Sequence, residues 1–380
     1  MVSCGEPSGD LYAGALVREL RARDPQLQAF GLGGERLAGA GADLVADFRG
    51  LSVTGLTEAL RVLPRSWSTY RRLLAAARER RPDVLVLIDY PDFNFRLMRA
   101  VKALGVPIVY YISPQLWAWR PGRMKTMQAL VDRVLVIFPF EEAIYRRAGV
   151  DVQFVGHPLV ELAAPTAAPA TLVREFGLDP SRPTVALLPG SRSNELTRLA
   201  PVLVAASRRI DAAMPGVQFV VARAPHLSDA AFTPFADAVT APPALRTTIV
   251  EGRTDDVLSV CDVVLTASGT ATVQTAIHGK PMVVLYKLSP VTYALGKPLA
   301  QVDMYAMVNL IAGRRIVREL IQDACTPKAV ADEAVGLLAD ESRRHQMSDA
   351  LADVMRALGG PGASGRAADA ILDLCARRSG

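Results

Sequence analysis

Two short segments combine glycine, serine and a charged side chain in a way that suits the binding of a phosphate. Residues 187–192 are LLPGSR, and residues 5–10 are GEPSGD. Each lies between a short apolar stretch and a helical pattern, so backbone N–H groups and a helix N-terminus would face an anion. Arg192 adds a planar guanidinium that matches phosphate geometry. We therefore expect Gly190, Ser191 and Arg192 to contact a phosphate.

The turn at residues 5–10 has two interpretations. Its glycines stand four residues apart around Glu6 and Ser8, which would let a ligand approach the backbone at Gly9. An ordinary strand-to-helix turn with Asp10 as a helix cap explains the same residues. The segment alone does not separate them.

A third segment of this kind, TASGTAT, covers residues 266–272. It follows an apolar run and opens a helix, so Ser268, Gly269 and Thr270 form a second candidate phosphate cradle, although Ser268 would also serve as a cap. Two cradles in one half of the chain predict a diphosphate ligand. No acidic cluster with magnesium-type spacing accompanies them, so we expect neither a metal nor another cofactor.

Residues 88–94, IDYPDFN, directly follow an apolar run, where open α/β sheets bind their ligands. A partly desolvated carboxylate there would act as a general base toward a hydroxyl. We expect Asp89 to be that base and Asp92 and Asn94 to cap the next helix, with Asp92 as the other candidate base.

Aromatic residues follow the next apolar run. Residues 113–120, SPQLWAWR, would offer a sugar or an acyl chain an aromatic surface, although tryptophan more often simply packs in a core. His157 is a candidate proton carrier, but a lone histidine beside a proline is more often structural.

Apolar runs alternate with helical patterns on both sides of an alanine- and proline-rich linker at residues 163–170, which predicts an α/β protein with two parallel sheets. We expect two Rossmann-like domains facing a central cleft, at residues 1–165 and 166–345. A helical tail, residues 346–380, would pack on the first domain or on a partner subunit. Only four residues precede the first glycine turn, whereas a central strand usually has five or six, so the first strand is either truncated or very short at its edge.

The 380 residues carry a net charge of +5, which favours anionic partners. No basic run alternates with aromatic residues, so nucleic acid is not expected. The four cysteines are scattered singly, which argues against zinc and disulfides and favours a reducing cytoplasm. No apolar run is long enough to span a membrane, and the N-terminus does not resemble a signal peptide.

Residues 60–74 have an apolar stripe flanked by arginines. Such a helix would lie in an anionic membrane interface, or would pack on the core with a solvated basic side. Pro64 interrupts the pattern. The candidate membrane-facing residues are Leu63, Trp67, Tyr70 and Leu74.

Together, these segments resemble the lipid-A-disaccharide synthases, inverting glycosyltransferases of the GT-B type. The matching segments, in chain order, are GEPSGD at 5–10, IDYPDFN at 88–94, SPQLWAWR at 113–120, FVGHP at 154–158, LLPGSR at 187–192, ASGTAT at 267–272 and NLIAGR at 309–314.

The resemblance implies transfer of 2,3-diacylglucosamine from its UDP donor to 2,3-diacylglucosamine 1-phosphate at the cytoplasmic face of the inner membrane, with a homodimer as one possible assembly. It implies that Asp89 activates the acceptor 6-hydroxyl and that Arg192 neutralises the departing UDP. It also places Glu6, Ser8 and Asn309 at the cleft. Relatives usually carry a glutamate at the position of Gln274 that binds the ribose, and glutamine is a weaker acceptor.

Three alternatives remain open. An N-acetylglucosaminyltransferase or a UDP-N-acetylglucosamine 2-epimerase would share the fold, and fold alone does not exclude them. A sugar-nucleotide or lipid-binding module without turnover would explain Gln274, but it would not explain why both Asp89 and Arg192 are present.

Overall fold

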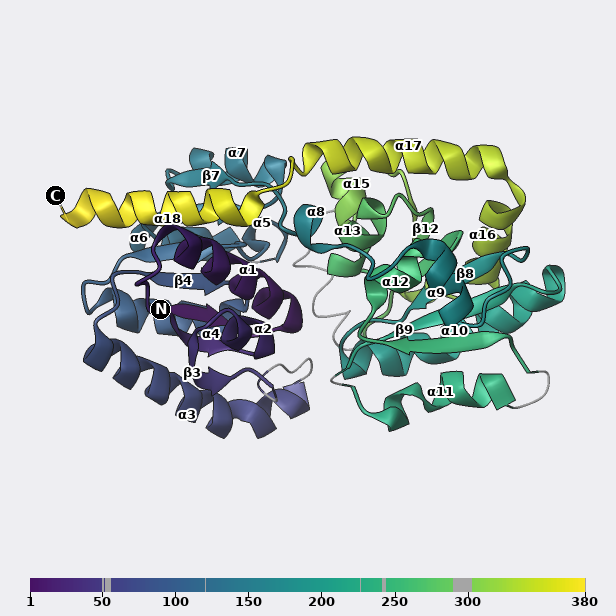
Figure 1. Cartoon of the computed structure of the whole chain (residues 1–380), viewed down its shortest axis with the longest axis horizontal. Coiled ribbons are helices and arrows are strands. Elements are labelled where there is room, and N and C mark those ends of the chain that lie inside the picture. Colours follow the sequence, from purple (N-terminus) through teal and green to yellow (C-terminus); the bar gives the residue numbers. More distant parts are fainter. Residues whose placement is uncertain are drawn as a thin grey trace. The chain divides into compact units, whose positions relative to one another are not determined.

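The computed structural model describes residues 1–49, 51, 56–119, 121–225, 227–240, 244–289 and 303–379. Their contacts divide the chain into two compact units (Figure 1). Unit 1 contains Met1–Pro158 and Leu358–Gly380, and unit 2 contains Leu159–Pro298 and Val302–Ala357. The chain therefore returns to unit 1 with its last helix.

Unit 1 has a seven-stranded parallel sheet with the order β3-β2-β1-β4-β5-β6-β7. The strand order reverses at the β1–β4 pair. Parallel α/β sheets bind ligands beside the carboxyl ends of their strands at such a reversal. The strands are β1 (Val2–Cys4), β2 (Phe30–Gly33), β3 (Asp43–Asp47), β4 (Leu85–Ile88), β5 (Ile108–Tyr111), β6 (Arg133–Val136) and β7 (Val152–Phe154).

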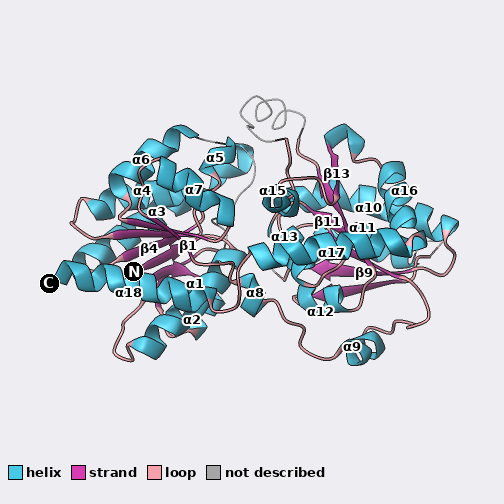
Figure 2. Cartoon of the chain, turned by 90° about the horizontal axis from the view of Figure 1, so that it is seen from above, coloured by secondary structure: helices cyan, strands magenta, loops and turns pink. Residues whose placement is uncertain are grey.

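Helices cover both faces of this sheet, with α1, α2 and α18 on one face and α3, α4 and α6 on the other (Figure 2). This two-sided cover explains why the central strands are almost entirely apolar. The helices are α1 (Pro7–Arg23), α2 (Glu35–Gly39), α3 (Leu56–Arg80), α4 (Pro91–Lys102), α5 (Leu116–Trp119), α6 (Met124–Leu130), α7 (Pro139–Arg147) and α18 (Ala363–Ser379), with a short 3₁₀ turn at Pro121–Arg123.

Unit 2 repeats the design with six parallel strands in the order β10-β9-β8-β11-β12-β13, reversing at the β8–β11 pair. Its strands are β8 (Thr184–Leu188), β9 (Gln218–Arg223), β10 (Thr247–Glu251), β11 (Val263–Ala267), β12 (Met282–Tyr286) and β13 (Arg318–Ile321). Its helices are α8 (Leu159–Leu162), α9 (Pro169–Glu175), α10 (Ser193–Ala213), α11 (Asp229–Thr240), α12 (Thr254–Ser259), α13 (Thr270–Ile277), α15 (Met307–Ala312), α16 (Pro327–Ala339) and α17 (Glu341–Ala357), with a 3₁₀ turn at Gln322–Ala324.

The expected pair of parallel-sheet α/β domains is confirmed. The first strand is short, as its sequence indicates, and β1 pairs with β2 on one side and with β4 on the other, so it is a central strand of the sheet. Its three residues are fully buried.

Helix α3 continues through Pro64, so this proline does not end the helix. The final helix α18 packs along α1, where Arg23 pairs with Asp369 at 2.5 Å. A second ion pair joins Arg133 to Asp373 at 3.2 Å. The last helix is therefore tied to unit 1 by charge pairs as well as by packing. No helix within the described part of the chain is long and apolar enough to cross a membrane.

Candidate active site

The loop after β1 lies at the strand-order reversal of unit 1, and its two acidic residues have different roles. Asp10 is buried, and its carboxylate accepts hydrogen bonds from the backbone N–H groups of Gly34, Arg36 and Leu37 at 2.7 to 3.1 Å. It therefore caps the neighbouring helix α2 and not its own helix. The side chains at Glu6 and Ser8 are partly exposed, whereas Gly9 is buried against Cys4.

Asp89 follows β4 on the other side of the reversal, in a strained backbone conformation. Asp89 and Tyr90 have φ values of 43° and 47°, in the left-handed region. Each such non-glycine residue costs about 1–3 kcal/mol. Two hydrogen bonds stabilise this strained conformation. The Asp89 carbonyl accepts from Asn94 Nδ2 and from the Tyr110 hydroxyl, both at 2.8 Å. The backbone of Asp89 is thus fixed by side chains of two other elements.

The negative charge of Asp89 affects the pKa values of two buried tyrosines. Burial raises the pKa of Tyr110 well above its ordinary value, and the negative charge of Asp89 adds to this rise. The same two causes raise the pKa of Tyr12. Both phenols stay protonated at neutral pH, so neither competes with Asp89 as a base.

Asp92 and Asn94 differ from Asp89 in their surroundings. The Asp92 side chain is 71% exposed and pairs with Arg123 at 2.6 Å. Asn94 is fully buried, accepts from the Ser3 hydroxyl at 2.7 Å and donates to the Asp89 carbonyl. The expectation that Asn94 caps α4 is therefore wrong, because its side chain joins the ends of β1 and β4.

The aromatic segment after β5 is anchored through Trp117. Its indole N–H donates to Glu141 Oε1 at 3.1 Å, and its ring packs edge-on against Phe140 with centroids 5.0 Å apart. The side chain of Trp119 and all of Arg120 lie outside the described residues. Trp117 itself is partly exposed.

Glu141 is a residue that the sequence analysis missed. It lies in the first turn of α7 just after β6, is 1% exposed, and burial raises its pKa to about 8, with Asp89 adding to the rise. Its place in the first turn after a buried parallel strand is a weak signal, because Glu141 does not directly follow the strand as Asp89 does.

His157 is buried between the rings of Tyr12 and Phe138. Burial lowers its pKa to about 3, so the imidazole is neutral near pH 7 and too weakly basic to carry a proton there. These contacts support the structural interpretation of this histidine.

In unit 2, the Gly190 loop follows β8 at the strand-order reversal. Gly190 has a φ of 109°, and a β-carbon there would lie 2.5 Å from Glu195 Oε2. Arg192 precedes the first residue of α10 and pairs with Glu195 at 3.2 Å, with the arginine side chain 42% exposed. Ser191 is exposed. Glu195, which the sequence analysis did not select, therefore pairs with Arg192 and lies close to Gly190.

The second loop follows β11, the strand adjacent to β8. The Ser268 hydroxyl donates to the Tyr305 carbonyl at 3.0 Å, and its N–H donates to the Leu285 carbonyl at 2.9 Å. Both hydrogen-bond donors of Ser268, its hydroxyl and its backbone N–H, are therefore bonded to carbonyl groups of the protein. Gly269, with a φ of 137°, and exposed Thr270 form the start of α13. The unbonded N–H groups of a first helical turn suit an anion.

Gln274 and Asn309 are both engaged within unit 2. Gln274 Nε2 donates to Asp255 Oδ1 at 2.7 Å, and His278 Nε2 lies 2.9 Å from the same oxygen. Asn309 is fully buried, with four hydrogen bonds to Ile316, Val317 and Glu319. Asn309 therefore joins α15 to β13, while Gln274 has a carboxylate beside it.

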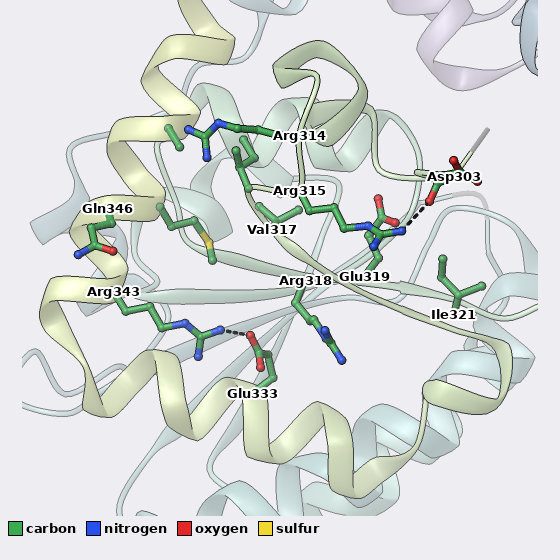
Figure 3. Close-up of a pocket in the computed structure, with 13 residues that line it drawn as sticks. Asp303, Arg314, Arg315, Val317, Arg318, Glu319, Ile321, Glu333, Arg343 and Gln346 are labelled. Atoms are coloured by element: carbon green, nitrogen blue, oxygen red, sulfur yellow. Dashed lines mark hydrogen bonds and ion pairs between the residues drawn. The ribbon is translucent and has the colours of Figure 1, made fainter.

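A cavity of about 740 Å³ in unit 2 contains none of the predicted site residues (Figure 3). Arginines 314, 315, 318 and 343 line it, and Figure 3 shows Arg315 bonded to Asp303 and Arg343 paired with Glu333. The cavity lies beside the edge strand β13, away from the β8–β11 reversal. Across the described residues, no cluster of three or more His, Cys, Asp or Glu side chains is arranged to hold a metal ion.

Comparison with solved structures identifies the fold. The glycotransferase of kitacinnamycin has a TM-score of 0.62 and 21% identity, over 98% of this chain and 97% of that chain. The UDP-GlcNAc 2-epimerase from Neisseria meningitidis, bound to UDP-GlcNAc, has a TM-score of 0.62 and 11% identity, over 98% and 99%. At these identities the likeness shows the fold, which is that of the GT-B glycosyltransferases.

Sequence comparison gives the family. The family model for lipid-A-disaccharide synthetase matches residues 1–371. The lipid-A-disaccharide synthase of Myxococcus xanthus is 45% identical over 98% of this chain and 97% of the relative. That of Geobacter sulfurreducens is 42% identical over 100% and 97%. The chain belongs to the lipid-A-disaccharide synthetase family and is therefore an enzyme of the glycosyltransferase class.

Proposed function

We propose that this chain transfers 2,3-diacylglucosamine from UDP-2,3-diacylglucosamine to 2,3-diacylglucosamine 1-phosphate, which yields the β-1,6-linked disaccharide 1-phosphate and UDP. Family membership supports this reaction. The observation that carries the proposal is the position of Asp89 and Arg192, each at the strand-order reversal of a parallel sheet. Such reversals are where open α/β sheets bind ligands.

In unit 1, Asp89 would take the proton of the acceptor 6-hydroxyl while that oxygen attacks the anomeric carbon of the donor. The bond from the anomeric carbon to the UDP oxygen breaks, its electron pair leaves with UDP, and the anomeric centre inverts. We take Asp89 as the base because it directly follows β4 at the strand-order reversal, whereas Asp92 lies in the first turn of α4. Glu6, Ser8 and Trp117 would contact the acceptor, with Gly9 supporting the turn.

In unit 2, Arg192 would bind the diphosphate and stabilise the charge that develops as UDP leaves. The backbone at Gly190, Ser191, Gly269 and Thr270 would supply N–H donors. Ser268 would shape its loop through Tyr305 and not touch the ligand. We give Asn309 the same kind of supporting role, because its amide is fully bonded.

The ribose would be recognised by Gln274 together with Asp255. A glutamine alone is a weaker acceptor than the glutamate that relatives usually carry at this position. The Asp255 carboxylate, 2.7 Å from Gln274 Nε2, restores an anionic acceptor beside it.

We also propose that the enzyme works at the cytoplasmic face of the inner membrane, where its acylated substrates reside. Leu63 and Trp67 on α3 are 48% and 57% exposed, whereas Tyr70 and Leu74 pack partly against the core. The membrane-facing part of the stripe would thus be its first half. Helix α18 packs on α1 of its own chain, so a homodimer would need no exchange of this helix.

The deciding experiment is an assay with purified protein, both acylated substrates and no added metal, in which disaccharide and UDP are followed in parallel. Equal amounts of both products would establish the synthase. Release of UDP from UDP-N-acetylglucosamine without the acylated acceptor would favour the epimerase, transfer of N-acetylglucosamine would favour that transferase, and UDP binding without any product would indicate the non-catalytic module.

A further inference from the structure

Glu141 is a buried carboxylic acid that the proposed mechanism does not use. Its side chain is 1% exposed. Oε1 accepts the Trp117 indole N–H at 3.1 Å, and its own backbone N–H donates to the Phe138 carbonyl. Oε2 is buried and has no hydrogen-bond partner among the residues that the structure describes. One oxygen is therefore fixed and the other is enclosed in a protein interior.

An ionised carboxylate would be poorly stabilised there. The Trp117 indole N–H and the Phe138 backbone favour the charged form, but the cost of burial is the larger effect and raises the pKa. Besides the Phe138 backbone, the groups that act on Glu141 are Asp89 from the β4–α4 loop, Trp117 from α5 and Tyr145 from its own helix. Asp89 is the only one of these three that carries a negative charge near neutral pH, because burial keeps the Tyr145 phenol protonated.

Two carboxylates that feel each other's charge in a poorly solvated region do not both ionise easily. Asp89 is partly exposed and Glu141 is enclosed, so the proton stays on Glu141. In that form its carbonyl oxygen still accepts the Trp117 N–H, which holds the indole in one orientation.

We propose that Glu141 is a positioning residue that, as a neutral acid, orients the Trp117 indole for the acceptor sugar and leaves Asp89 as the ionised carboxylate of the pair. Trp117 would then offer the sugar a fixed aromatic face. The kinetic part of this inference rests on the proposed function, whereas the Trp117–Glu141–Asp89 coupling does not.

The coupling is tested by tryptophan fluorescence in full-length protein carrying Trp67→Phe and Trp119→Phe, so that Trp117 is the only indole. We expect its emission to change with pH with a midpoint near 8, as Glu141 ionises beside the indole N–H. Glu141→Gln should abolish this transition. Asp89→Asn, which removes the neighbouring charge, should move the midpoint to lower pH. A flat profile, a transition that survives Glu141→Gln, or an unmoved midpoint would overturn the proposal.

The kinetic test uses Glu141→Leu, which removes the acceptor for the indole N–H, and Glu141→Gln, which keeps an uncharged carbonyl in its place. We expect Glu141→Leu to lower kcat/KM for the acceptor about tenfold with UDP binding unchanged, and Glu141→Gln to recover most of that loss. Glu142→Gln is the matched control, because Glu142 is the adjacent carboxylate on α7 and pairs with Arg146.

Equal losses in the two Glu141 variants, or no loss in either, would overturn the positioning role. Absence of disaccharide with the unmodified chain would instead overturn the proposed function, and the fluorescence titration would still decide the coupling. Far-ultraviolet circular dichroism of each variant separates loss of folding from loss of positioning, and Glu141→Gln, which conserves shape, carries the test if Glu141→Leu does not fold.

Discussion

The ring of Tyr90 occupies the space that a side chain at Gly5 would need. A β-carbon built on Gly5 would lie 2.2 Å from Tyr90 Cγ and 2.3 Å from Cδ1. The contact joins the loop after β1 to the strained turn that carries Asp89. Glycine at position 5 is therefore a condition for the position of the candidate base.

Gly5→Ala should destabilise the protein by about 1–3 kcal/mol, the usual cost of overpacking, and should lower turnover because the Tyr90 ring must move. In a Tyr90→Ala background the same change should cost at least about 1 kcal/mol less, because contacting residues are not additive. Urea unfolding of the four proteins measures this coupling. Gly39→Ala is the control, since a β-carbon there meets nothing within 4 Å. Additive effects of the two changes would contradict the contact.

Asp89→Asn should lower kcat about 10²- to 10⁴-fold, the range that a general base contributes, while UDP binding in unit 2 is retained. Asp92→Asn should change kcat less than about threefold, because Asp92 is an exposed ion-pair partner of Arg123 and exposed pairs contribute little. Steady-state kinetics with UDP titration calorimetry measures both. If Asp92→Asn gave the larger loss, the two aspartates would have to exchange roles.

The sequence predicts the central strands well because burial on both faces makes them continuous apolar runs. Three strands are not continuous apolar runs, and each has a physical reason. Phe30–Gly33 contains two glycines, which weaken a strand signal. Asp43–Asp47 and Arg318–Ile321 are edge strands, and the charged residues within them interrupt the apolar pattern.

Residues of the candidate site could be predicted from the sequence only where they follow a predicted strand in the chain. Asp89 and Arg192 were found by that rule, whereas the roles of Asp10, Glu141 and Asp255 depend on partners from other segments. Trp117 and Glu141 are 24 residues apart, and Asp255 and Gln274 are 19 apart. No periodicity or motif connects such positions, so their hydrogen bonds emerge only in the folded chain.

Arg192→Ala should lower kcat/KM for the UDP donor about 10²- to 10³-fold, the usual cost of losing one donor to the developing charge. Arg192→Lys should recover only part of this, because an ammonium lacks the planar fork of a guanidinium. Arg209→Ala, an exposed arginine near the other end of α10, is the control. Initial rates at varied donor concentration decide this, and full activity of Arg192→Ala would remove Arg192 from the phosphate site.

Leu63→Glu with Trp67→Glu should reduce binding to anionic vesicles by about tenfold, because both apolar side chains are exposed on α3 and would contact the lipid. Phosphatidylglycerol vesicles in a sedimentation assay measure the binding. The control is Leu104→Glu, another exposed leucine of unit 1, at 41% exposure. Equal binding of all three proteins would exclude this stripe as a membrane contact.

His157 predicts a pH dependence of stability with a definite sign. Burial lowers its pKa to about 3 from an ordinary value of 6.5, so the folded state binds fewer protons than the unfolded state between these values. Stability is then unaffected by this group above pH 6.5 and falls by up to about 1.4 kcal/mol per pH unit as the pH drops below it.

Urea unfolding of His157→Gln between pH 7 and 5 should show a shallower decline than the unmodified chain, whatever the absolute cost of the substitution. His345→Gln, which changes an exposed histidine on α17, should keep the original slope. Identical slopes for the unmodified chain and His157→Gln would mean that the imidazole becomes charged inside the fold, and would reopen a proton-carrying role for this residue.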